Sequence, residues 1–250
     1  MRNRLLLTTA ITPVLMLAGV APSLAQQGMP AVAYPNVTLG GSAGSWFDEV
    51  FGVAEGRLTV PLDHAFGAQL DGVAGSIGGE AYGHIGGHAF WRAPTSGLFG
   101  LYGAWVHQGG MGSGRIGPEA ELYFDKLTLS GVAGWTFGDG RDGDFFTHAK
   151  ASLYLDPNHK FYAGYSYEGG SAGVVGFEAF HPGPRISGFA EARIATDHYA
   201  AMGGLRFLSG APGKSLMDRE REDVVPLWMH VAEEETTPAP TTAAPSTQPP

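Results

Sequence analysis

Two histidines, His84 and His88, stand four residues apart in the stretch GEAYGHIGGH. Imidazole nitrogens are common zinc ligands, so the pair raises the question of a metal site. A helix would bring the two rings together, but the stretch is too rich in glycine for one. On a strand the rings share a face and lie ~13 Å apart at ~3.3 Å per residue, too far to bind one ion. The spacing therefore predicts hydrogen-bonding histidines and no metal site.

Carboxylates form two further groups. Asp139, Asp142 and Asp144 offer hard oxygen ligands for Ca²⁺, but the full EF-hand spacing is absent, which favours a solvated acidic loop. Glu119 and Glu121 stand two residues apart, ~6.6 Å on a strand, a spacing that paired catalytic carboxylates could also use. Nothing else suggests a sugar cleft, so we interpret these two glutamates as charges on one strand face.

Nucleophilic catalysis finds little support. Outer-membrane hydrolases use a serine–histidine pair with a third orienting group, and outer-membrane proteases use aspartate and histidine at the barrel rim. The sequence contains no H-x-S-N segment, and we expect no G-x-S-x-G elbow. It contains no cysteine, which excludes disulfides, thiolate metal sites and a cysteine nucleophile. We expect no enzyme activity and no cofactor.

The amino-acid composition indicates which kind of secondary structure carries these residues. The 250 residues are 44% hydrophobic and 16% charged, and 39 of them are glycine, which favours tight turns and thin strands. The net charge of -9 and the lack of a long basic cluster argue against a nucleic-acid partner.

The N-terminus has the layout of a secretory signal peptide over residues 1–25. Two arginines precede an apolar run, and the small-residue site SLA follows at residues 23–25. Pro13 and two threonines shorten the apolar run below the ~20 residues that a spanning helix needs, so an uncleaved anchor is the less favoured alternative. No other stretch resembles a spanning helix, so any membrane insertion of the mature chain must be by strands.

Extended segments separated by Gly, Asp, Asn and Pro turns fill the chain from about residue 35 to 207. Most approach the ~9–11 residues that a tilted strand needs to cross a bilayer. Roughly twelve are recognised, an even number as bacterial barrels require, and ten is the alternative because the first and ninth are weak. They lie near residues 37–43, 50–62, 66–76, 81–91, 98–107, 115–124, 127–136, 145–155, 161–168, 173–180, 186–195 and 199–207.

The stretch RISGFAEARI shows how the two strand faces differ. One set of alternate positions reads Ile, Gly, Ala, Ala, Ile, and the other reads Arg, Ser, Phe, Glu, Arg. Gly and Ala fill a protein core poorly against the usual density of ~0.74, whereas fluid lipid conforms to a thin wall. The pattern favours an all-β, antiparallel, up-and-down transmembrane β-barrel over residues 26–208. A secreted or periplasmic β-sandwich is the alternative.

Strand parity assigns the polar faces to the lumen, although a register error of one residue would turn a whole set toward lipid. The carboxylates in this set outnumber the cations, which predicts a cation-preferring pore. Pro118 counts against a closed barrel unless a bulge or a later strand start accommodates it. The candidate pore-lining residues are Arg57, Asp71, His84, His88, Glu119, Glu121, Lys150, Glu168, Glu178, Glu191, Arg193 and Arg206.

Several motifs resemble those of small porin-like outer-membrane β-barrels of Gram-negative bacteria. They are VPLDHAFGAQLDG, GGHAFWRAPTSGLFGLYG, LTLSGVAGW and GLRF, and the resemblance runs from about Thr59 to the segment SLMDRERED. It implies an outer-membrane location and a barrel fold. It carries no catalytic residues. Such barrels usually end on an aromatic residue, which Phe207 would supply, but here a tail follows it.

Residues 209–250 form this tail, which ends in the Pro/Thr-rich TTPAPTTAAPSTQPP. Its composition predicts a largely disordered periplasmic segment outside the barrel. Expected partners are outer-membrane lipid, lipopolysaccharide and the barrel-assembly machinery, with peptidoglycan or a periplasmic protein as alternatives for the tail. We expect a channel for passive diffusion of small hydrophilic solutes. A non-conducting structural or adhesive barrel, or a soluble binding module, is the alternative.

Overall fold

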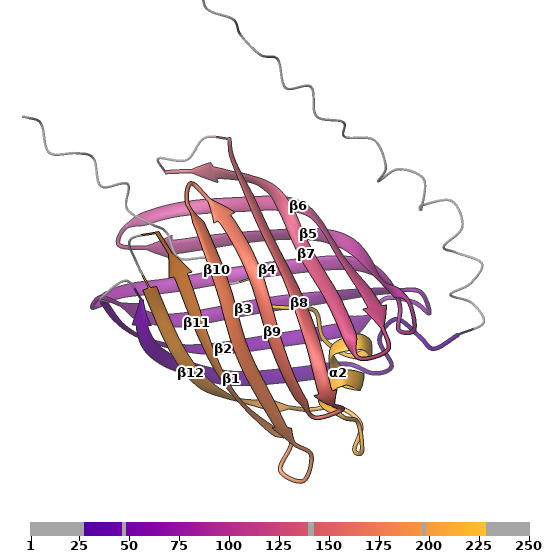
Figure 1. Cartoon of the computed structure of the whole chain (residues 1–250). Helices are drawn as coiled ribbons and strands as arrows, with labels where there is room; N and C mark the ends of the chain where they lie inside the picture. Colours follow the sequence, from indigo (N-terminus) through magenta and orange to yellow (C-terminus); the bar gives the residue numbers. More distant parts are fainter. Residues whose placement is uncertain (1–27, 47–48, 140–142, 197–198, 229–250) are drawn as a thin grey trace, which may run out of the picture.

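Twelve antiparallel strands close into a barrel in the computed structural model (Figure 1). The structure describes residues 28–46, 49–139, 143–196 and 199–228. The signal-peptide prediction lies outside these residues. Within them no helix is long and apolar enough to cross a membrane. The strands are β1 (Asn36–Trp46), β2 (Glu49–Pro61), β3 (Phe66–Ile77), β4 (Glu80–Ala93), β5 (Gly97–Gln108), β6 (Met111–Phe124), β7 (Leu127–Gly138), β8 (Asp144–Asp156), β9 (His159–Glu168), β10 (Ser171–His181), β11 (Ile186–Ala195) and β12 (Tyr199–Leu208).

Each strand pairs with its neighbours in the chain, and β1 pairs with β12 to close the ring, from Thr38 opposite Leu208 to Trp46 opposite Ala200. The predicted fold class is therefore confirmed, with twelve strands and not ten. Two-residue Gly-Gly turns join β3 to β4 and β5 to β6. All four glycines have positive φ, as the hairpin turns that match the twist of paired strands require.

The outer surface of the wall is apolar. In β11, Ile186 and Ile194 are exposed while Ser187 is fully buried, so the apolar face of RISGFAEARI points outward. Large exposed side chains such as Leu101, Ile116 and Leu205 continue this face around other strands. A soluble sandwich would bury these side chains, so the inverted pattern indicates a lipid environment.

Pro118 lies inside β6 without a bulge. Ile116 pairs with Trp135 and Glu119 pairs with Val132, so β6 and β7 keep the same register on both sides of the proline. The expected bulge or later strand start is therefore wrong, since β6 begins earlier, at Met111. Beside the proline, glycine lets the backbones of β6 and β7 approach each other closely. A Cβ on Gly117 would lie 1.9 Å from the Ala133 carbonyl oxygen.

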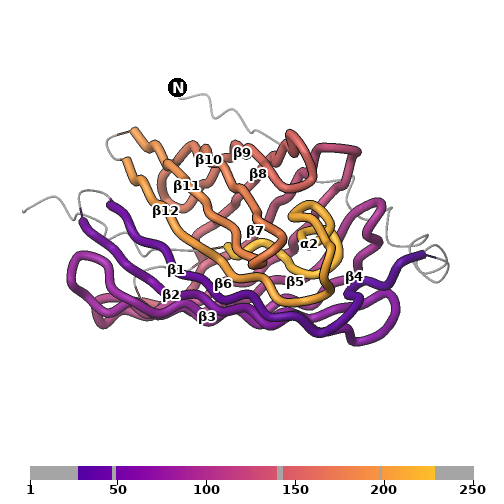
Figure 2. Tube along the Cα trace, turned by 90° about the horizontal axis from the view of Figure 1, so that it is seen from below, coloured from indigo at the N-terminus to yellow at the C-terminus, as the bar shows by residue number. Residues whose placement is uncertain are grey.

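The tail leaves β12 and turns back across one end of the barrel. Residues 209–213 lead into the helix α2 (Leu216–Glu222), and the chain then enters the space enclosed by the strands. Figure 2 shows this yellow segment between β1–β3 below and β8–β11 above. For residues 209–228 the expectation of a disordered segment outside the barrel is wrong. Residues 229–250 lie outside the described part.

The outward face yields a stability prediction. Ile85 lies near the middle of β4 with 56% of its surface exposed, whereas Leu155, with 51% exposed, lies at the end of β8. Ile85→Arg should destabilise the barrel by ~2–4 kcal/mol, because it places a charge near the bilayer midplane, and Leu155→Arg by only ~0–1 kcal/mol near the interface. Urea unfolding in lipid vesicles would measure both. Equal costs would contradict this placement of the membrane.

Candidate functional site

All twelve candidate pore-lining residues occupy inward-facing positions of their strands, and each is buried or half-buried. Four further charged residues share these faces. Glu55 precedes Arg57 by two positions, Arg92 follows His88 by four, Arg115 precedes Glu119 by four, and Lys160 lies on the inward face of β9. Strand parity could have found Glu55 and Arg115, which lie inside predicted strands, whereas Arg92 and Lys160 each lie one residue beyond a predicted strand end.

These additions change the charge balance of the lumen. Among the described strand residues that are buried or half-buried there, carboxylates and cations now match one to one. The carboxylates are Glu55, Asp71, Glu119, Glu121, Glu168, Glu178 and Glu191, and the cations are Arg57, Arg92, Arg115, Lys150, Lys160, Arg193 and Arg206. The carboxylate excess that suggested a cation-preferring pore is therefore absent.

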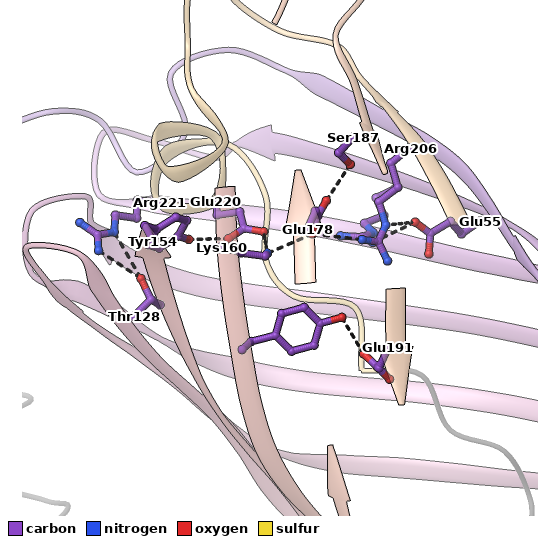
Figure 3. Close-up of polar contacts among 12 residues, drawn as sticks. Glu55, Thr128, Tyr154, Lys160, Glu178, Ser187, Glu191, Arg206, Glu220 and Arg221 are labelled. Atoms are coloured by element: carbon purple, nitrogen blue, oxygen red, sulfur yellow. Dashed lines mark hydrogen bonds and ion pairs between the residues drawn. The ribbon is translucent and has the colours of Figure 1, made fainter. Parts of the chain in front are cut away.

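Glu178 is the centre of an ion-pair network that crosses several strands (Figure 3). Its carboxylate lies 3.1 Å from Lys160 Nζ and 3.3 Å from Arg206 Nη1, and it accepts a 2.6 Å hydrogen bond from the Ser187 hydroxyl. Arg206 Nε also donates to Glu55 at 2.5 Å, and Arg57 reaches Glu55 at 3.1 Å. Opposite charges on β2, β9, β10 and β12 are thus paired along one arc of the inner wall.

The two histidines have different surroundings. His88 lies between two carboxylates, with Nε2 2.8 Å from Asp71 and Nδ1 2.9 Å from Glu119. Its predicted hydrogen-bonding role is confirmed. Neither ring nitrogen of His84 has a hydrogen-bond partner among the described residues, so the same role stays a prediction for His84.

Glu119 and Glu121 have different partners. Glu119 contacts His88 and the indole of Trp228, whereas Glu121 accepts a 2.6 Å hydrogen bond from the Tyr123 hydroxyl. Each carboxylate therefore has its own structural partner. Among the described residues no group of three His, Asp or Glu side chains could hold a metal ion. In the acidic loop at residues 139–144, Asp139 accepts a hydrogen bond from the Gly112 amide, and Asp142 lies outside the described residues.

The letters G-x-S-x-G do occur twice, as GGSAG around Ser42 and around Ser171. Ser42 lies within β1, and Ser171 begins β10 with its hydroxyl 2.8 Å from that of Tyr165. A nucleophile elbow needs a strand–turn–helix context, which neither serine has. Both occurrences of these letters therefore stand in a strand context.

The helix α2 is attached to one rim of the barrel. Ser215 and Asp218 form a capping box that begins the helix. The Leu216 amide donates to Asn158 Oδ1 at 3.2 Å in the turn between β8 and β9. Arg221 donates to the Phe124 carbonyl at 3.0 Å, at the end of β6 beside its turn to β7. These contacts span adjacent turns, so the helix has a defined position at the rim.

Lys214 connects the two ends of this helical segment. Its Nζ lies 2.6 Å from Asp223 and 2.9 Å from Glu222. Burial acts to lower the pKa of Lys214, but its hydrogen bonds to Asp223 and Glu222 outweigh burial and raise the pKa above the usual lysine value. The ammonium therefore stays charged at neutral pH, and these ion pairs persist.

Residues 223–228 continue into the lumen, where wall side chains bind their backbone. Gln69 donates to the Val225 carbonyl at 3.0 Å and accepts from the Val225 amide at 2.8 Å. Arg92 donates to the Val224 carbonyl at 2.7 Å, and the Tyr102 hydroxyl donates to the Trp228 carbonyl at 3.1 Å. We refer to residues 214–228 as the plug.

Apolar contacts complete the fit of the plug. Val225 packs in a buried cluster with Val32, Phe90 and Leu98. Trp228 packs in a second cluster of buried residues, and its ring stacks on that of His148 with 6.0 Å between the ring centres. Burial of these side chains favours the inserted position of the plug.

Two cavities remain beside the plug, with volumes of about 110 and about 60 Å³. Such volumes accommodate water molecules. Lys150, Glu191, Arg193 and Leu227 line both cavities. The lumen is therefore a polar interior of which the plug occupies a large part.

No family model matches the chain, and no curated protein matches it. Solved structures of membrane β-barrels do match the chain. A membrane protein from a study of in-meso crystallization has a TM-score of 0.55 at 12% identity, covering 75% of this chain and 91% of its own. KdgM porin in complex with disordered oligogalacturonate has a TM-score of 0.53 at 6% identity, covering 70% and 99%. Omp33 of Acinetobacter baumannii has a TM-score of 0.48 at 12% identity, covering 69% of this chain and 97% of its own.

At these identities the likeness of the first two structures shows the fold alone. It is that of a closed membrane β-barrel, which in this chain has twelve strands.

Proposed function

We propose that the chain forms a narrow channel for passive diffusion of small hydrophilic solutes, and that the plug restricts this channel. One observation carries the proposal. Each described hydrogen bond between residues 223–228 and the wall has a wall side chain as one partner, and none belongs to a backbone ladder. The segment that fills the lumen is therefore separable from the wall, and a polar passage would remain without it.

The positions of the first and last strands indicate the side of the membrane from which the plug enters the barrel. Both Asn36 of β1 and Leu208 of β12 lie at the barrel end where the plug enters. We place this end in the periplasm, as the termini of bacterial outer-membrane barrels suggest. Lipopolysaccharide contacts outside and the assembly machinery inside the cell envelope stay predictions, as does a peptidoglycan or protein partner of the tail.

A non-conducting structural barrel is the second candidate, and the paired charges that line the lumen favour it. Liposome swelling separates the two. The channel predicts that liposomes carrying the barrel without its plug swell faster in arabinose than in the larger raffinose, because a narrow pore selects by size. Swelling no faster than that of protein-free liposomes, with the barrel correctly inserted, would support the structural role.

A further inference from the structure

Glu220 of α2 places its carboxylate against two neighbouring strands of the wall (Figure 3). One oxygen is ion-paired with Lys160 Nζ, and the other accepts a 2.5 Å hydrogen bond from the Tyr154 hydroxyl. Tyr154 and Lys160 face each other across the pairing of β8 with β9. Each carboxylate oxygen thus has a donor of its own, which is the arrangement of a carboxylate-binding site.

A second ammonium group lies beside this site. Lys150, also on β8, lines the larger cavity together with Lys160 and Glu220. Its Nζ lies 5.4 Å from the ring centre of Tyr162 and 5.7 Å from that of Trp228, and it has no ion pair within the described part of the chain. Two cations on adjacent strands repel each other, so a carboxylate near both lowers the electrostatic energy.

Departure of the plug would remove Glu220 but leave its donors in place. The cavity is lined by Arg57, Lys150, Lys160, Arg193 and Arg206, and the wall opposes these five cations with the four carboxylates Glu55, Glu121, Glu178 and Glu191. The local charge is then positive. A lumen of this sign attracts anions.

We propose that Lys160 and Tyr154, with Lys150 beside them, form a binding site for the carboxylate of small acidic solutes, and that Glu220 occupies this site while the plug is inserted. The assignment rests on the proposed channel function for its biological role, but the site itself is a property of the wall and α2. An acidic solute and Glu220 would compete for the same donors, so the solute would favour departure of the plug.

Chemical rescue tests the site without any ion flow. Glu220→Ala removes the carboxylate and should lower the temperature at which the folded barrel loses its fast gel mobility, because the two lysines lose a counter-charge. Sodium acetate should restore much of this loss by entering the vacated site. Acetamide, or sodium chloride at the same ionic strength, should not. Glu222→Ala is the matched control, since Glu222 contacts Lys214 and not the wall.

A folded Glu220→Ala barrel with no acetate-specific rescue would overturn the proposal, and so would equal rescue in a Lys160→Met, Glu220→Ala double variant.

A second measurement follows departure of the plug through the reactivity of a thiol and does not need the alanine variant. The chain has no cysteine, so Leu227→Cys gives a single thiol in the plug. Glutarate should increase the reaction rate of this thiol several-fold over glutaramide, and an equal rate would also overturn the proposal. Because neither assay uses conduction, failure of the site and failure of the channel are separate results.

Discussion

Deletion of residues 213–250 is expected to change a mostly closed barrel into one that carries a steady current in planar bilayers. The deletion removes the backbone segment that Gln69, Arg92 and Tyr102 bind in the lumen, together with the indole of Trp228. The strand ladder stays complete, because β1 and β12 close the ring before the tail begins. The shortened chain should therefore still insert and still shift in gel mobility on heating.

The matched control is deletion of residues 233–250 alone. This change leaves each described contact of the plug in place, so conductance and heat stability should equal those of the full chain. A folded, inserted barrel that lacks residues 213–250 and carries no current would reject the channel. Failure of the shorter deletion to fold would show that the end of the tail has a structural role.

A full-length variant tests the same gate without shortening the chain. Glu220→Lys places a third cation beside Lys150 and Lys160, so repulsion replaces attraction where the helix meets the wall. Openings should become more frequent, most clearly at low ionic strength, where screening is weakest. Glu222→Lys, on the same helix but against Lys214, should have a smaller effect. The reverse order would show that the plug is held chiefly by its own internal ion pairs.

The strands and their faces could be predicted because the evidence for them is local. Alternation of side chains along RISGFAEARI depends on adjacent residues only, and it correctly placed Glu191 and Arg193 inside and Ile194 outside. The lumen charge was nevertheless misjudged. Arg115 shares a face with Glu119 but was left out of the count, and Lys160 lies one residue before the predicted strand 161–168, so parity was not applied to it.

The plug could not be predicted from local pattern. Its contacts join residues far apart in sequence, such as Gln69 with Val225, and no periodicity encodes them. One signal was present in the tail. The run VVPLW between the charged helix and the Pro/Thr-rich end is too apolar for a solvated segment, and such a run needs a surface against which to bury. In a barrel with an apolar exterior and a polar interior, the lumen supplied that surface through a few buried clusters.

The ion-pair network leads to the largest expected change in stability. Glu178 is shared by Lys160 and Arg206, and its side chain is only 5% exposed. Glu178→Leu leaves two cations without this carboxylate in the lumen, and removal of one partner from a buried ion pair costs ~3–5 kcal/mol. Lys160 retains Glu220 and Arg206 retains Glu55, so we expect the lower end of this range. Urea unfolding in lipid vesicles would give the free energy of unfolding.

Two companion variants show which property of Glu178 matters. Glu178→Gln removes the charge but retains an oxygen for the hydrogen bond from Ser187, so it should cost less than the leucine variant. Glu49→Leu removes a carboxylate from an exposed position at the start of β2 and should be nearly neutral. If Glu178→Leu cost no more than about 1 kcal/mol, water would have to enter the network and screen its ions as at a protein surface. The lumen would then be hydrated even with the plug inserted, and the ion pairs would not be an obstacle to the passage of solutes.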